Sequence, residues 1–133
     1  MTSATTEKKR TILVIDDDIP MTDLIREILI IDGHRVCIAN DGLTGIRLAG
    51  EVQPDLILMD ITMPVIDGYR TTEQLKKLPG LKDIPVVFLT GRSAADDAGR
   101  AFACGGASYL LKPFTNQQIR DLVRLTLEPG ETG

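Results

Sequence analysis

Five side chains able to bind a metal or react with phosphate follow short apolar segments of the chain. Asp16 and Asp17 follow the first segment, Asp60 the third, Thr90 the fourth and Lys112 the fifth. Neighbouring carboxylates repel one another unless positive charge lies among them. A compact group of carboxylates suits Mg²⁺, which often binds through one or two carboxylates together with a phosphate. These residue types therefore favour metal-assisted chemistry on a phosphoryl group.

Charge counting supports the same interpretation. The carboxylates of Asp16, Asp17 and Asp60 are opposed by one ammonium, that of Lys112, so a divalent cation would neutralise the group. An aspartate can attack phosphorus and become an aspartyl phosphate. Phosphoryl transfer depends mainly on positioning and charge neutralisation, so no histidine base is required. The single histidine, His34, is predicted to lie in a turn after the first helix, where it is badly placed for such a role.

Short apolar segments alternate with longer amphipathic ones along the chain. The apolar segments are continuous, which is typical of parallel strands covered on both faces. The predicted strands are 11–15, 35–39, 55–59, 84–89 and 107–111. The predicted helices are about 20–33, 41–50, 67–78, 93–104 and 115–127. Five such repeats predict an α/β fold, with an open, doubly wound, five-stranded parallel sheet and five helices.

Helix-capping residues support these boundaries. Asp18 is expected in the cap region of the first helix, and Gly33 stands where that helix should end. Ser93 opens the fourth helix, and Thr115 with Gln118 forms a capping box for the fifth. Ligands of open α/β sheets bind outside the carboxyl ends of the strands, where the strand order switches. The chemically active side chains are therefore expected to meet at that edge.

Four segments, in this order, resemble the receiver domain of bacterial two-component response regulators. They are ILVIDDD at 12–18, LILMDITMPVIDG at 56–68, VVFLTG at 86–91 and LLKPF at 110–114. One acidic pair alone would be weak evidence, whereas four motifs at four strand ends are strong evidence. The resemblance covers about 11–127, and it implies a flavodoxin-like fold with strand order 2-1-3-4-5.

The resemblance also implies roles for the acidic residues. Asp60 would be the phosphoacceptor and a metal ligand. Asp17 would bind Mg²⁺ directly, Asp16 would bind it through water, and the main-chain carbonyl of Thr62 would supply a further ligand. Mn²⁺ is the alternative ion. The donor would be the phosphohistidine of a sensor histidine kinase or of a histidine phosphotransfer protein.

The same family pattern implies a switch. Lys112 would pair with Asp60 and then with the phosphoryl group, and its bond to Pro113 would be cis. Thr90 would close on a phosphoryl oxygen, and Tyr109 would swing inward behind it. The alternative for Tyr109 is a half-buried strand aromatic with no switching role.

The predicted elements 93–104, 107–111 and 115–127 would form the output face. That face would signal to a downstream target or to an output domain that is missing here. The resemblance allows a homodimer through the same face and leaves the oligomeric state open. Gly99 lies in the middle of the fourth predicted helix and weakens it, so we expect this helix to be easily remodelled.

Two positions depart from chemotaxis-type receivers. Thr62 stands where those members carry an amide, and Arg92 stands where they carry a carboxylate. Both positions flank the path of the hydrolytic water. We therefore expect a longer phosphoryl lifetime than in the fast chemotaxis-type members.

Other noticeable residues have ordinary structural interpretations. Cys37 and Cys104 are expected to be reduced, apolar thiols, and Met59 and Met63 to pack in the core and a loop. The apolar run 28–31 exceeds what one helix face needs. It is either deeply buried between helices or a docking patch for the phosphoryl donor, and the sequence favours neither.

Composition excludes several classes of function. The formal net charge is -4 and aromatic residues are scarce, which disfavours direct binding to nucleic acid. No membrane span or signal peptide is seen, so a cytoplasmic location is expected. The expected organisation is a disordered N-terminal tail at 1–10, a receiver domain at 11–127 and a C-terminal tail at 128–133.

Two other classes fit less well. A phosphatase of the haloacid dehalogenase type requires D-x-D-x-[TV] after its first strand, but residues 16–20 read DDDIP and the chain is short for that fold and its cap. A flavodoxin-like carrier of FMN needs hydroxyl and main-chain donors at the same place, and the carboxylates there would repel its phosphate.

Overall fold

The computed structural model describes residues 10–91 and 94–128, without the side chains of 94–98. Five parallel strands form one sheet in the order β2-β1-β3-β4-β5. The strands are β1 (Thr11–Ile15), β2 (Arg35–Ala39), β3 (Leu56–Asp60), β4 (Val86–Thr90) and β5 (Ser108–Leu111). This topology confirms the predicted fold class, including the strand order.

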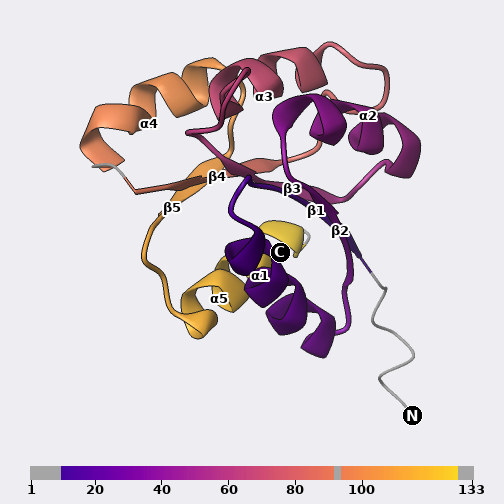
Figure 1. The fold of residues 1–133 in the computed structure, drawn as a ribbon, viewed down its shortest axis with the longest axis vertical. Coiled ribbons are helices and arrows are strands. Elements are labelled where there is room, and N and C mark those ends of the chain that lie inside the picture. Colours follow the sequence, from indigo (N-terminus) through magenta and orange to yellow (C-terminus); the bar gives the residue numbers. More distant parts are fainter. Residues whose placement is uncertain (1–9, 92–93, 129–133) are drawn as a thin grey trace.

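Helices cover both faces of the sheet (Figure 1). They are α1 (Ile19–Ile31), α2 (Gly42–Val52), α3 (Gly68–Lys76), α4 (Ala94–Ala103) and α5 (Asn116–Leu127). Helices α1 and α5 lie on one face, and α2, α3 and α4 lie on the other (Figure 1). None of the helices within the described ranges is long and apolar enough to span a membrane.

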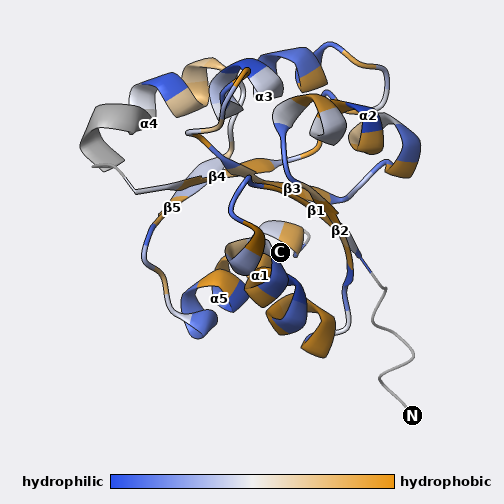
Figure 2. Ribbon diagram, viewed as in Figure 1, coloured by the Kyte–Doolittle hydropathy of each residue, from blue (hydrophilic) through white to orange (hydrophobic). Residues whose placement is uncertain are grey.

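Burial on both faces explains the continuous apolar runs. Alternate residues of each central strand point to opposite faces, so β1, β3 and β4 contribute to two separate cores. Leu13, Met59 and Phe88 pack toward α2, α3 and α4. Val14 and Leu58 pack toward α1 and α5. The central strands are accordingly among the most hydrophobic parts of the ribbon (Figure 2).

Aspartate and threonine caps fix where the helices begin. The Asp18 carboxylate accepts from Met21 N at 3.1 Å, which confirms its predicted place in the cap of α1. Asp41 and Asp67 cap α2 and α3 in the same way. The capping box of Thr115 and Gln118 at α5 is also present. Helix α1 follows β1, and helix α3 follows β3. Their caps therefore fix the loops beside the acidic residues at the ends of these two strands.

The third, fourth and fifth strands have bounds that differ from the sequence prediction. The third strand runs to Asp60 rather than ending at Met59, because Asp60 pairs with Leu89 of β4. Asp55 lies outside it, with its carboxylate accepting from Thr11 N at 2.8 Å. The fourth strand runs over Val86–Thr90 rather than 84–89, and the fifth begins at Ser108 rather than at 107. These shifts follow the pairing of neighbouring strands, which apolar character alone does not specify.

The apolar run at the end of α1 divides into two parts. Ile28 and Leu29 are buried, whereas Ile30 is 52% and Ile31 is 81% exposed. Burial between helices therefore accounts for half of the run. The predicted cap at Ser93 and most of both predicted tails lie outside the described residues.

Candidate functional site

Three carboxylates meet at the carboxyl ends of β1 and β3. Each of Asp16, Asp17 and Asp60 offers an oxygen within 4.8 Å of the other two. Asp16 and Asp60 are buried and Asp17 is exposed. The chain passes to β2 on one side of β1 and returns to β3 on the other, so this is the point where strand order switches. The cluster therefore occupies the place where this fold binds ligands.

Lys112 places an ammonium between two of these carboxylates. Its Nζ lies 3.2 Å from Asp16 Oδ2 and 3.2 Å from Asp60 Oδ1. The residue directly follows β5 at the sheet edge, and its bond to Pro113 is cis, as predicted. Burial alone would lower the pKa of Lys112, but the two carboxylates outweigh this effect and raise it. Lys112 is thus held in its charged form.

Asp60 is the most perturbed acid of the cluster. Burial is the main cause that raises the pKa of Asp60 to about 6, and repulsion from Asp16 adds to it. The attraction of Lys112 offsets only part of this rise. One ammonium among three carboxylates leaves a deficit of positive charge. The oxygen donors and the charge of this cluster therefore fit a hard divalent cation such as Mg²⁺.

The hydrogen bonds of Asp16 distinguish it from Asp17. Asp16 Oδ1 accepts from Asp18 N at 3.0 Å, and Oδ2 faces Lys112. Within the described ranges, the Asp17 carboxylate has no hydrogen-bond or ion-pair partner. The Asp17 carboxylate therefore has the greatest freedom to bind a metal directly, while Asp16 is already engaged on both oxygens.

Asn40 contributes a contact that the sequence did not predict. Its Nδ2 donates to the main-chain oxygen of Asp16 at 2.9 Å. The predicted start of the second helix at 41 is confirmed, because Asp41 caps α2, and no role was predicted for Asn40. The sequence feature that could have predicted this contact is the position of Asn40 directly after β2, which lies beside β1 in the sheet.

Thr90 and Tyr109 lie on the α4 side of the sheet. Thr90 is buried at the last position of β4, one residue beyond Leu89, the partner of Asp60. Tyr109 pairs with Phe88 and is half-buried against the core under α3 and α4. Because Phe88 and Thr90 are two apart on one strand, Tyr109 and Thr90 share a face of the sheet.

The loop after β3 brings α3 against the phosphoacceptor candidate. Gly68 N donates to Ile61 O at 2.8 Å, and a β-carbon at Gly68 would lie 2.3 Å from the main-chain oxygen of Asp60. Only glycine permits this approach. Thr62 is exposed in the same loop, whereas Met63 is buried, which confirms its predicted packing role.

Arg100 joins α4 to the start of α3, a contact that the sequence did not predict. Its guanidinium lies 4.3 Å from the centre of the Tyr69 ring and 3.9 Å from Asp67 Oδ2. Tyr69 in turn contacts Phe88, with ring centres 5.3 Å apart. Gly99, beside Arg100 in α4, is exposed. Arg92 lies outside the described residues.

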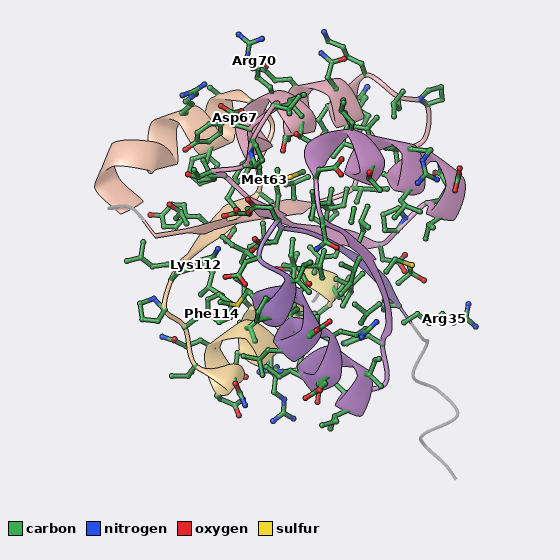
Figure 3. The ribbon with its side chains drawn as sticks, viewed as in Figure 1. Arg35, Met63, Asp67, Arg70, Lys112 and Phe114 are labelled. Atoms are coloured by element: carbon green, nitrogen blue, oxygen red, sulfur yellow. The ribbon has the colours of Figure 1, made fainter. Side chains whose placement is uncertain are left out.

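The remaining sequence candidates lie away from the site. His34 precedes β2, at the opposite edge of the sheet from the acidic cluster. Figure 3 shows the neighbouring Arg35 pointing away from the protein, far from Lys112. Cys37 is half-buried and Cys104 is buried, and both thiols are free, as predicted.

This fold and site define a class, the flavodoxin-like α/β proteins with an acidic cluster at the switch point. Comparison with known families matches residues 12–124 to the response regulator receiver domain. The chain therefore belongs to the response regulator receiver domain family of two-component signalling systems. Receiver domains of this family act with histidine kinases.

Curated relatives agree with this assignment. The chain is 37% identical over 113 residues to a probable transcriptional regulator, ycf29, of Porphyra purpurea, covering 85% of this chain and 54% of that protein. It is 38% identical over 116 residues to the DNA-binding dual master transcriptional regulator RpaA of Synechocystis sp., covering 87% of this chain and 48% of that protein. The chain thus spans about half the length of the curated relatives it matches.

Solved structures share the fold. The receiver domain of a sensor histidine kinase from Pseudomonas aeruginosa PAO1 aligns with a TM-score of 0.82 and 28% identity, over 90% of this chain and 98% of that one. That structure has a magnesium ion coordinated in its active site cleft. The Vibrio cholerae chemotaxis protein CheY4 aligns with a TM-score of 0.87 and 24% identity, over 90% of this chain and all of that one.

Proposed function

We propose that this receiver domain accepts a phosphoryl group on Asp60 in a Mg²⁺-dependent reaction. The observation that carries the proposal is the acidic cluster at the switch point, with Lys112 3.2 Å from Asp60. The related kinase receiver with a bound magnesium ion supports the choice of metal. Mn²⁺, which has similar oxygen preferences, is the alternative ion.

The metal would be held by Asp17, Asp60 and the main-chain carbonyl of Thr62, with Asp16 acting through water. When bound, Mg²⁺ supplies positive charge that stabilises the transferring phosphoryl oxygens. It also favours the ionised, nucleophilic form of Asp60, whose pKa is otherwise raised to about 6. Thr90 and Lys112 provide the protein's own donors to the phosphoryl group.

The reaction moves one phosphoryl group between two side chains. A carboxylate oxygen of Asp60 attacks phosphorus as the P–N bond to the donor imidazole breaks. The imidazole leaves with the bonding electron pair and takes up a proton, and the acyl phosphate forms on Asp60. Lys112 stays charged throughout and neutralises the phosphoryl oxygens. The donor is a sensor histidine kinase or a histidine phosphotransfer protein.

The signal then passes through Thr90 and Tyr109 to the face formed by α4, β5 and α5. These three elements carry exposed apolar side chains at Phe102, Leu111 and Leu125. Exposed apolar groups of this kind suit a protein partner, which is a downstream target, an attached output domain or a second copy of the chain. The transcriptional regulators among the relatives support an output domain.

The receiver unit is assigned to residues 11–127, with tails at 1–10 and 128–133. A cytoplasmic location fits a partner of histidine kinases. The net charge of -4 argues against direct contact between this domain and nucleic acid.

Intact-mass measurement after incubation with acetyl phosphate and MgCl₂ tests the proposal. One added phosphoryl group is expected on the parent protein and none on Asp60→Asn. Asp18→Asn is the matched control, because Asp18 is a neighbouring carboxylate that caps α1 and asparagine caps equally well. Turnover of a phosphate ester or a bound yellow flavin would instead support the other two classes.

A further inference from the structure

We infer that Asn40 is a positioning residue for the metal site. It would act by fixing the main chain of the acidic loop, residues 16–18, between β1 and α1. This inference rests on the proposed function. The side chain of Asn40 reaches no carboxylate in the described structure. It donates from Nδ2 to the main-chain oxygen of Asp16 at 2.9 Å.

Apart from the ion pair between the Asp16 side chain and Lys112, the acidic loop has few other ties to the sheet. Asp16 N donates to Ala39 O at 3.1 Å, which extends the pairing of β1 with β2 by one residue. Asp18 N donates a hydrogen bond to Asp16 Oδ1, a contact within the loop itself. Asn40, the residue after β2, supplies one more hydrogen bond to the loop. In the described ranges it is the one side chain outside the loop that bonds to the loop's main chain.

This bond sets the direction of Asp17. The oxygen that accepts from Asn40 belongs to the peptide group that joins Asp16 to Asp17. Because a peptide group is planar, holding its oxygen also holds the nitrogen from which Asp17 continues. The exposed Asp17 carboxylate has no hydrogen-bond or ion-pair partner of its own among the described residues. Its position therefore depends on the main chain that Asn40 fixes.

Capping does not account for Asn40. The cap of α2 is Asp41, whose carboxylate accepts from Thr44 N at 2.7 Å. Asn40 is exposed, so water could satisfy its amide equally well. A single part-buried hydrogen bond between neutral groups adds little to overall stability. Its main consequence is to restrict the loop before the metal arrives, which lowers the cost of ordering the ligands.

Calorimetric titration with MgCl₂ alone tests this role, using Asn40→Ala. The expected result is a dissociation constant raised about ten-fold, at the lower end of the range for residues that orient metal ligands. When Asn40→Ala is phosphorylated by acetyl phosphate, the Mg²⁺ concentration that gives half the maximal rate should also rise about ten-fold. The rate at saturating Mg²⁺ should stay close to that of the parent. A purely structural role would not separate these two quantities.

Gln53→Asn provides the matched control. Gln53 is also exposed and also donates a side-chain amide to a main-chain oxygen, that of Gly50 at 3.1 Å, but at the far end of α2. Asparagine tolerates the left-handed conformation of Gln53, with φ of 55°. Gln53→Asn should bind Mg²⁺ with the affinity of the parent. Its midpoint of urea unfolding should be similar to that of Asn40→Ala.

Two results would overturn the inference. One is an affinity for Mg²⁺ in Asn40→Ala within about two-fold of the parent. The other is an equal loss in both variants, which would indicate general destabilisation. If the parent itself neither binds Mg²⁺ nor becomes phosphorylated, the proposed function fails and this inference fails with it. The parent measurement therefore separates the two failures.

Discussion

The main-chain oxygen of Asp60 lies only 2.3 Å from where a β-carbon at Gly68 would stand. The same added atom would lie 2.9 Å from Ile61 Cα. Both neighbours are backbone atoms, so neither can move without shifting the end of β3. The absence of a side chain at Gly68 thus allows α3 to begin directly against Asp60.

Gly68→Ala should therefore damage the site as well as the fold. Overpacking of this kind costs about 1–3 kcal/mol of unfolding free energy. Phosphorylation by acetyl phosphate should slow, because Asp60 is displaced relative to Lys112. Gly50→Ala is the control, since a β-carbon there meets nothing within 4 Å and should not destabilise the protein. Unchanged stability and phosphorylation in Gly68→Ala would contradict the described packing.

Asp60→Asn should stabilise the metal-free protein at neutral pH. Burial raises the pKa of Asp60 from 3.8 to about 6, so the folded state favours the neutral acid. Stability from this group is complete below the unfolded pKa and is lost as the pH rises through about 6. Asparagine stays neutral, so the variant should be more stable by about 1–3 kcal/mol near pH 7.5.

Urea unfolding across pH in the presence of EDTA measures this difference. The gap between Asp60→Asn and the parent should shrink as the pH falls toward about 4, where the folded parent also carries a neutral group. Saturating Mg²⁺ should raise the stability of the parent more than that of the variant. A constant gap at every pH would show that the pKa of Asp60 is not raised.

Thr62 and Arg92 should give the phosphoryl group a long lifetime. The exposed Thr62 side chain has no amide to orient the hydrolytic water, and Arg92 has no carboxylate to do so. Thr62→Asn should shorten the lifetime about three- to ten-fold, as expected of one hydrogen bond of about 1 kcal/mol. Decay of labelled phospho-Asp60 measures this, and decay of the parent within seconds would disprove the expectation.

Gly99→Ala should stabilise α4. A β-carbon at Gly99 would meet nothing within 4 Å, so alanine adds helix propensity at no steric cost. The expected gain is about 1 kcal/mol, with slower hydrogen exchange in α4 than in the parent. Gly106→Ala is the opposite control, because a β-carbon there would lie 2.4 Å from the Phe88 ring. Equal exchange rates in Gly99→Ala and the parent would show that Gly99 does not loosen the helix.

The sequence predicted those parts of the site that depend on position along a strand. Asp16, Asp60 and Lys112 each stand at the carboxyl end of a short apolar segment, and the parallel fold brings such ends together. Contacts between separate elements could not be predicted in the same way. Asn40 and Arg100 act through partners whose distance depends on how β2 and α4 pack, which one sequence does not encode locally.

Strand boundaries show the same limit. Apolar character predicted a third strand at 55–59, but pairing with Leu89 extends it to Asp60 and the Asp55 carboxylate binds Thr11 N instead. Hydrophobicity reports burial, whereas the ends of a strand are set by its neighbours. That one-residue difference places Asp60 on the last position of β3, within the rigid sheet.

The location of the phosphoryl group is the most direct test of the central claim. Borohydride reduction of an aspartyl phosphate gives homoserine at the modified position, which peptide mass spectrometry can identify. After treatment with acetyl phosphate and Mg²⁺, homoserine should appear at position 60 alone, and EDTA should prevent it. Homoserine at position 16 or 17, or none in the presence of Mg²⁺, would contradict the assignment of Asp60 as the phosphoacceptor.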